Sequence, residues 1–143
     1  MHTDDFTIRR ADESDMGAVF PLVVEFGTSF VPERGRFDQA FRRVLTDENA
    51  CVLVAADREK LEAYLLGFEH ESFYANGPVS WVEEVAVTAP VRGIGIGRAL
   101  MNIFEEWAAS RGACLVGVAT RRASEFYSAL GYDESAAYFL KVL

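Results

Sequence analysis

The sequence has little of what a membrane protein, a secreted protein or a nucleic-acid-binding protein needs. No apolar run approaches the roughly 20 residues that span a bilayer. The acidic start, M-H-T-D-D-F, lacks the basic and apolar regions of a secretory signal. The 14 Lys and Arg are outnumbered by 22 Asp and Glu, which gives a net charge of -8. Because nucleic-acid phosphates call for a basic face, we expect no nucleic acid and no membrane as partners, and a cytoplasmic location.

Cysteine is also scarce. Cys51 and Cys114 each stand alone in an apolar, strand-like run, which is typical of reduced core thiols and not of a disulfide or metal pattern. No spacing suggests a metal site, and no Ser-His-Asp or Cys-His arrangement suggests a nucleophile. With 143 residues, half of them apolar and a quarter charged, the chain should form a single domain over residues 1–143.

What the sequence does contain is a strand, a glycine-rich loop and a helix in immediate succession. The strand over 82–87 is rich in valine, Pro90 should end it for lack of an amide hydrogen, and Gly93, Gly95 and Gly97 lead into an amphipathic helix. Glycine lets the backbone turn tightly and approach a ligand, and the first amides of a helix have no partner within it. The stretch therefore predicts an anion cradle that suits phosphate groups.

The glycine spacing excludes two familiar phosphate loops. A dinucleotide fingerprint, G-x-G-x-x-G, would need its last glycine at Arg98 or Leu100. A P-loop needs Lys and then Ser or Thr after its last glycine, where this chain has Arg and Ala. The pattern that fits is R-x-x-G-x-G, made by Arg92, Gly95 and Gly97, preceded by E-E-V-A-V-x-x-P and followed by R-A-L.

This combination resembles the acyl-coenzyme A loop of the GNAT superfamily of N-acetyltransferases. The resemblance implies acetyl-CoA as cosubstrate, with its pyrophosphate on the loop. It also implies the GNAT fold, an α/β architecture in which about four helices flank a central mixed sheet. The positions to which it assigns coenzyme binding are Val85, Ala86, Val87, Arg92, Gly93, Ile94, Gly95, Ile96, Gly97, Arg98, Thr120, Ala123 and Tyr127.

The expected order of elements fits this fold across nearly the whole chain. Apolar patterns predict strands over residues 6–10, 51–56, 61–69, 82–87, 113–119 and 136–142. Helices are expected from a cap at Asp12 or Ser14 to Gly27, over 33–45, from the glycine loop to Gly112, and over 122–130. The family often has two strands after its last helix, but only 12 residues follow Gly131. One strand there leaves the acceptor side partly open, or completed by a second copy in a homodimer.

Two neighbouring carboxylates are candidates for the base. Glu83 and Glu84 should point to opposite faces of a strand, and the one that faces the cleft could take a proton from an incoming ammonium. Glu83 matches the proposed base of polyamine acetyltransferases, so it ranks slightly ahead. Either carboxylate could instead be a solvated or ion-paired strand residue.

Tyr127 is the candidate for assisting the leaving group. It lies in A-S-E-F-Y-S-A-L-G-Y, which resembles the family segment A-x-x-F-Y-x-x-L-G-F. The resemblance implies that this tyrosine protonates or hydrogen-bonds the departing sulfur. Because phenols have a pKa of ~10 and thiols ~8.5, hydrogen bonding is the safer assignment. Periodicity by itself favours a core position for Tyr127, since it shares a helical face with Phe126 and Leu130.

Further assignments complete the hypothesis. In the family the sheet splays beside the glycine loop, so here the gap should be edged by 84–87 and 115–118, with the amide of Val87 polarising the thioester carbonyl. Thr120 stands where the family often has asparagine. The leading function is N-acetylation of a small-molecule or peptide amine by direct attack; the alternative is an acyl-CoA sensor without chemistry. The loops over 27–35 and 72–77 match no pattern that identifies the acceptor.

Overall fold

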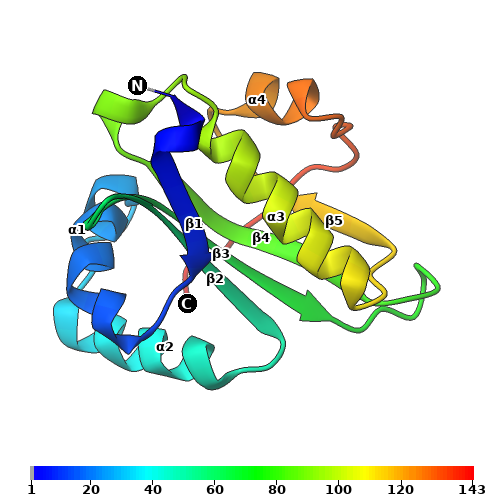
Figure 1. Cartoon of the computed structure of the whole chain (residues 1–143). Helices are drawn as coiled ribbons and strands as arrows, with labels where there is room; N and C mark the ends of the chain where they lie inside the picture. The colour runs from blue at the N-terminus through cyan, green and yellow to red at the C-terminus, as the bar shows by residue number, and fades with distance from the viewer. Residues whose placement is uncertain (1) are drawn as a thin grey trace.

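A computed structural model describes residues 2–143 of the chain. These residues form one sheet with the strand order β1-β2-β3-β4-β5, in which β1 to β4 are antiparallel and β5 is parallel to β4. The strands are β1 (Phe6–Arg10), β2 (Ala50–Asp57), β3 (Lys60–His70), β4 (Val79–Val87) and β5 (Leu115–Val118). The helices are α1 (Met16–Phe26), α2 (Arg34–Thr46), α3 (Ile96–Ser110) and α4 (Ser124–Ala129). Figure 1 shows the mixed α/β fold that the sequence predicts.

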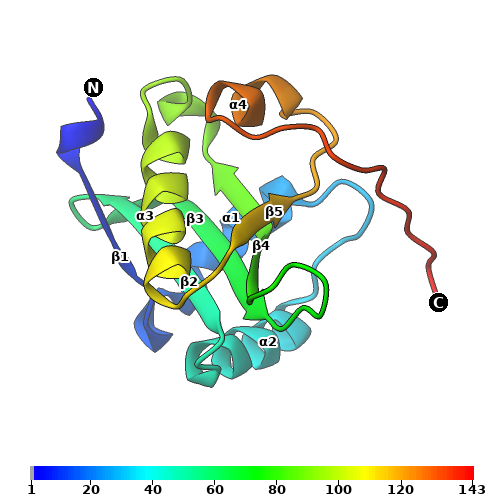
Figure 2. The ribbon, with the colours of Figure 1, turned by 90° about the vertical axis from the view of Figure 1, so that its right-hand side faces the viewer.

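Helices cover both faces of the sheet, and each face has its own apolar core. On one face, Leu53 packs with Phe104 of α3. On the other, Val54 packs with Phe41 of α2 and with α1. Because successive strand residues point to opposite faces, the unbroken apolar run of β2 supplies both cores. The sheet is thus the middle layer, with α3 on one face and α1 and α2 on the other (Figures 1 and 2).

One irregularity in β4 decides where its carboxylates point. Adjacent residues of β3 pair with Val82 and Glu84, so Glu83 between them is the extra residue of a β-bulge. A bulge interrupts the alternation of side chains. Val82 and Val85 consequently both pack in the core under α3, whereas Glu84 turns to the face of α1 and α2.

The predicted last strand, over 136–142, is wrong. These residues form no strand, and every residue from 133 to 143 is exposed. Figure 2 shows the end of the chain running away from β5. A strand-like pattern indicates that the side chains would fit a half-buried sheet, but it does not supply the neighbouring strand. Here no such surface covers Tyr138 or Phe139, which are 64% and 88% exposed.

The expectation of two core thiols is correct for one cysteine. Cys51 is fully buried in β2, and burial raises the pKa of its thiol. Cys114 is exposed, because β5 begins only at Leu115 and not at residue 113. The strand therefore begins two residues later than the apolar run predicts.

Candidate active site

The sheet opens between β4 and β5. The two strands pair only through Val79–Val82 and Leu115–Val118, and beyond these residues β4 continues to Val87 with β3 on one side and no strand on the other. The prediction that 84–87 edges a gap therefore agrees with the structure. The prediction for 115–118 is wrong, because this segment is the paired part. β5 ends at Val118.

The amide of Val87 faces this gap. Thr88 donates its amide hydrogen to the carbonyl of Glu62 on β3 at 2.9 Å. Since amides of successive strand residues point to opposite sides, that of Val87 points away from β3. The carbonyl of Val87 lies on the same side, where it accepts a hydrogen bond from Arg92 Nε at 2.8 Å.

The glycine loop presents a row of amides without acceptors. Gly93 and Gly95 have φ of +84° and +102°, a region open mainly to glycine. Gly95 is the N-cap of α3, and its carbonyl accepts the first helical bond, from the amide of Ala99 at 3.0 Å. Among residues 2–143, none of the amides from 93 to 98 donates to a protein acceptor. Such a row fits phosphate oxygens.

The arginines around the loop divide into two groups. Arg92 is held by the carbonyl of Val87 and lies 3.7 Å from Glu25 of α1. Arg98, Arg121 and Arg122 are exposed, and in the described part of the chain none of them forms a salt bridge. They are exposed positive charges in a protein of net charge -8.

Close packing places α4 beside the loop. A Cβ on Gly97 would lie 3.2 Å from the Phe126 ring, so glycine is what lets α4 approach the start of α3 (Figure 1). The Tyr127 ring packs edge-on against Phe126 and Tyr132, with ring centroids 4.9 and 5.8 Å apart. Burial raises the pKa of Tyr127. Its hydroxyl therefore keeps its proton at neutral pH, and residues 2–143 offer it no hydrogen-bond partner.

Thr120 and Ala123 shape the chain before α4. The hydroxyl oxygen of Thr120 accepts a hydrogen bond from the amide of Ala123 at 3.0 Å. The hydroxyl hydrogen of Thr120 stays available to donate. Both residues therefore have a local structural use, alongside the coenzyme contact that the sequence suggested.

The two candidate bases differ sharply in environment. Glu84 is half-buried and accepts a hydrogen bond from the hydroxyl of Tyr64 at 2.7 Å. Burial raises the pKa of Glu84, and the nearby charge of Glu83 raises it further, while the Tyr64 hydrogen bond opposes this shift. Glu83 is exposed and accepts a hydrogen bond from Trp81 Nε1 at 3.1 Å. A raised pKa is what a proton acceptor near neutral pH needs, so the environment favours Glu84 over Glu83.

Sequence reasoning missed Tyr64. A tyrosine in an apolar strand carries no signal of its own, and it meets Glu84 only through the pairing of β3 with β4. Knowledge of the register, including the bulge, would have been needed to find it.

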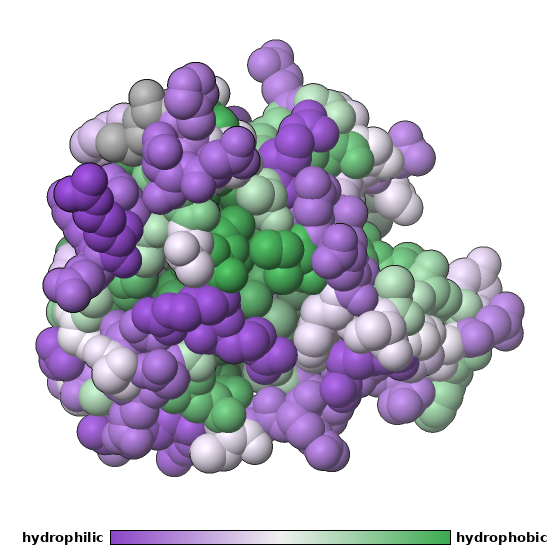
Figure 3. Space-filling model, in the orientation of Figure 1, coloured by the Kyte–Doolittle hydropathy of each residue, from purple (hydrophilic) through white to green (hydrophobic). Residues whose placement is uncertain are grey.

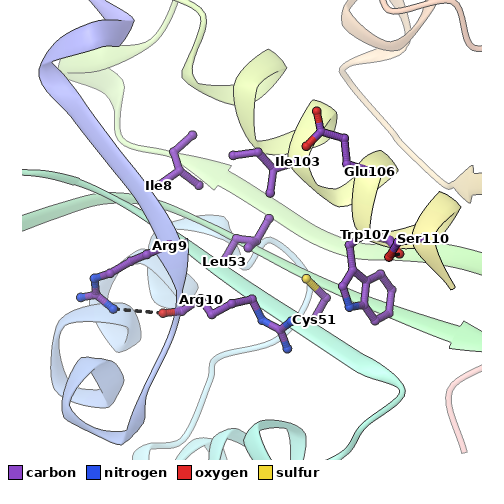
Figure 4. Close-up of a pocket in the computed structure, with 9 residues that line it drawn as sticks. All are labelled: Ile8, Arg9, Arg10, Cys51, Leu53, Ile103, Glu106, Trp107 and Ser110. Atoms are coloured by element: carbon purple, nitrogen blue, oxygen red, sulfur yellow. Dashed lines mark hydrogen bonds between the residues drawn. The ribbon is translucent and has the colours of Figure 1, made fainter.

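A hollow of about 390 Å³ lies away from this site, between β1, β2 and the later turns of α3. Its lining includes Ile8, Leu53 and Trp107, with Arg10 and Glu106 beside them (Figure 4). Figure 3 shows apolar surface in the middle of this face. The glycine loop lies at the opposite end of α3, so this hollow takes no part in the candidate site.

Comparisons with solved structures agree with the geometry. A transcriptional regulator from Bacillus halodurans C-125 is 23% identical, with 96% of this chain and 99% of that one covered and a TM-score of 0.86. Glucosamine-6-phosphate N-acetyltransferase from Arabidopsis thaliana is 20% identical, with 96% and 97% covered and a TM-score of 0.84. An aminoglycoside acetyltransferase from an uncultured soil metagenomic sample, in complex with sisomicin, is 20% identical, with 98% and 97% covered and a TM-score of 0.75. At these identities the likeness establishes the fold.

The family follows from the sequence itself. No curated protein matches the chain. The model of the acetyltransferase (GNAT) family matches residues 17–132, a stretch that contains the gap, the glycine loop and Tyr127. Among residues 2–143, no helix is long and apolar enough to cross a membrane. The chain therefore belongs to the acetyltransferase (GNAT) family, and it is an acyltransferase by class.

Proposed function

We propose that this protein transfers the acetyl group of acetyl-CoA to a primary amine by direct attack. The observation that carries the proposal is the row of unpaired amides from 93 to 98, which lies next to the open end of β4. A phosphate group on those amides and an acyl arm in the gap would bring a thioester to the Val87 amide.

The coenzyme end of the site is built from loop and helix. The amides of Gly95 and Gly97 would hold pyrophosphate oxygens at the start of α3, where the helix dipole also favours negative charge. Arg98 and the pair Arg121 and Arg122 supply positive charge for the phosphates. The acyl arm then lies along the open edge of β4.

The chemistry needs a neutral amine. The carboxylate of Glu84 takes a proton from the ammonium, directly or through one water, and the freed lone pair attacks the acetyl carbonyl carbon. As the C–N bond forms, the carbonyl oxygen becomes an oxyanion, which the Val87 amide stabilises by about 3 kcal/mol. Collapse of this intermediate breaks the C–S bond, the nitrogen gives up its second proton to the departing thiolate, and that sulfur accepts a hydrogen bond from Tyr127.

The test of the proposal is release of free thiol from acetyl-CoA in the presence of a panel of amines. We expect turnover with at least one amine, and we expect Glu84→Gln to lower kcat by about a hundredfold or more. The matched control is Glu83→Gln, which removes an exposed carboxylate next to it and should change kcat by less than about threefold. A larger loss in the Glu83 variant would move the base to that residue.

A rival from another class is an acyl-CoA sensor that regulates a partner. The specific observation in its favour is the likeness to a solved transcriptional regulator. Tyr127→Phe separates the two. The enzyme should lose about tenfold to a hundredfold in kcat while its affinity for coenzyme A, measured by calorimetry, stays within about twofold. Coenzyme binding without turnover of any amine would favour the sensor.

A further inference from the structure

A second hollow lies on the face of the sheet opposite α3. It has a volume of about 120 Å³ and lies between α1, α2 and the strands β2 to β4. Apolar side chains such as Val23, Phe37 and Leu66 line most of it. Among its lining residues Glu84 is the one with a charged group, and Tyr64, also in the lining, donates its hydroxyl to that carboxylate. We name this hollow the α1–α2 groove.

The α1–α2 groove has a closed floor and an open rim. Its floor is made by buried side chains that include Phe41 and Val52. At the rim Val23 and Leu66 are half-buried, and Ala40 is exposed. A ligand can therefore reach the groove from solvent, which distinguishes it from an internal packing gap.

We infer that the acceptor amine carries an apolar group, which the α1–α2 groove receives while Glu84 attracts the ammonium. This inference rests on the proposed function. A dry cavity of about 150 Å³ lined by apolar side chains is large enough for benzene. A groove of about 120 Å³ that opens to solvent thus suits a short alkyl chain or a single ring.

Charge and polarity determine which other groups the acceptor can carry. In surroundings of low dielectric constant, one carboxylate attracts one ammonium strongly. An amino sugar or a phosphorylated amine would bring hydroxyls or phosphate against hydrocarbon, where each unpaired polar group costs free energy. The groove lining holds no cation to meet an anionic acceptor. The class that fits is a monoamine attached to a hydrocarbon chain or ring.

The groove and the gap both border β4. Glu84 is three residues before Val87 on β4, a distance of about 10 Å along a strand. An amine nitrogen between the two would have its proton acceptor on one side and the acetyl carbon on the other. Its apolar substituent would then extend into the α1–α2 groove.

The first experiment measures kcat/KM for a series of straight-chain amines from ethylamine to hexylamine, with 2-phenylethylamine and glucosamine for comparison. We expect kcat/KM to rise about fourfold for each added methylene until the groove is full. Glucosamine should be at least tenfold poorer than 2-phenylethylamine. Equal values along the series, or a preference for glucosamine, would overturn the inference and leave the acetyltransferase function in place.

A variant tests the location. Ala40→Trp places a large ring at the exposed rim of the groove, and we expect it to lower kcat/KM for 2-phenylethylamine at least tenfold without changing the affinity for coenzyme A. The control is Gln39→Trp, one position along the exposed surface of α2 and outside the groove lining. If the two variants behave alike, the acceptor does not use the groove.

A binding readout separates this inference from the proposed function. Titration of 2-phenylethylammonium into the protein, followed by NMR, should shift signals of groove residues in the wild type and not in Ala40→Trp. Binding at the groove with no acetylation of any amine would reject the enzyme but keep the site. Acetylation of amines with no shift at the groove would reject the site but keep the enzyme.

Discussion

Tyr64 donates its hydroxyl to the carboxylate of Glu84 at 2.7 Å, across the pairing of β3 with β4. Partial burial raises the pKa of this carboxylate, and the hydrogen bond is the contribution that opposes the rise. If Glu84 is the base, Tyr64 holds its carboxylate in place and favours its ionised form, because the hydrogen bond lowers the pKa of Glu84.

The first prediction concerns Tyr64→Phe. Removal of the hydroxyl removes a contribution that lowers the pKa of Glu84, so that pKa should rise further. The acid limb of the pH profile of kcat/KM should then move to higher pH, and activity at neutral pH should fall by about tenfold, the equivalent of ~1.4 kcal/mol. A merely structural role for Tyr64 predicts an unmoved acid limb.

Ionisation of Glu84 should lower the stability of the folded protein, so the effect should depend on pH. Its folded-state pKa is raised, so the stability it contributes is fully present below its unfolded pKa of ~4.3 and is lost as pH rises through the folded value. Glu84→Gln removes this loss and can still accept the Tyr64 hydrogen bond. We expect the variant to melt about 2 to 4 °C higher than wild type at pH 8 and no higher at pH 4. A lower melting temperature at pH 8 would contradict the cost.

Asp15 should show the opposite dependence on pH. Arg9 forms two hydrogen bonds of 2.7 Å with this buried carboxylate, and the pair lowers its pKa. The resulting stability is present above the unfolded pKa of ~3.9 and is lost as pH falls through the folded value. Asp15→Asn should cost about 2 kcal/mol in urea unfolding at pH 7, and the difference should shrink in acid.

The control for Asp15 is another ion pair. Asp38 pairs with Arg34 one helical turn away on the surface of α2, and its side chain is 23% exposed, against 7% for Asp15. Because exposed pairs contribute little, Asp38→Asn should change the free energy of unfolding by less than about 0.5 kcal/mol. Equal losses in the two variants would mean that burial does not strengthen the Arg9 pair.

The glycine loop can be tested with a matched pair of variants. Gly95→Ala forces alanine to φ +102° and brings a Cβ within 2.9 Å of Thr3 Oγ1. Gly112→Ala, after the end of α3, has a similar φ of +85° with open space around it. Each should lose about 1 kcal/mol or more of stability. Calorimetry should show coenzyme affinity reduced about tenfold in Gly95→Ala alone.

Local sequence was sufficient to predict the glycine loop with its unpaired amides. An anion cradle needs a few consecutive residues, glycines at positive φ and the unpaired amides of a helix start, and all of these lie between 92 and 98. The helices α1 to α3 and the strands β1 to β4 were predictable for a similar reason, because the spacing of apolar residues that marks a helix or a strand lies within one short segment. The tail over 136–142 had the pattern of a strand but no neighbouring surface to complete one.

The difference between the two candidate bases depended on tertiary structure. Whether Glu83 or Glu84 enters the core is decided by one bulge in β4, and a bulge arises from pairing with β3 and leaves no mark in the local alternation. Tyr64 became part of the site for the same reason. The sequence by itself determined that this chain belongs to a family of acyl-CoA-dependent enzymes, since backbone amides in a loop are specified by neighbouring residues. Only the folded sheet decided which carboxylate is buried, because register joins residues that are far apart in the chain.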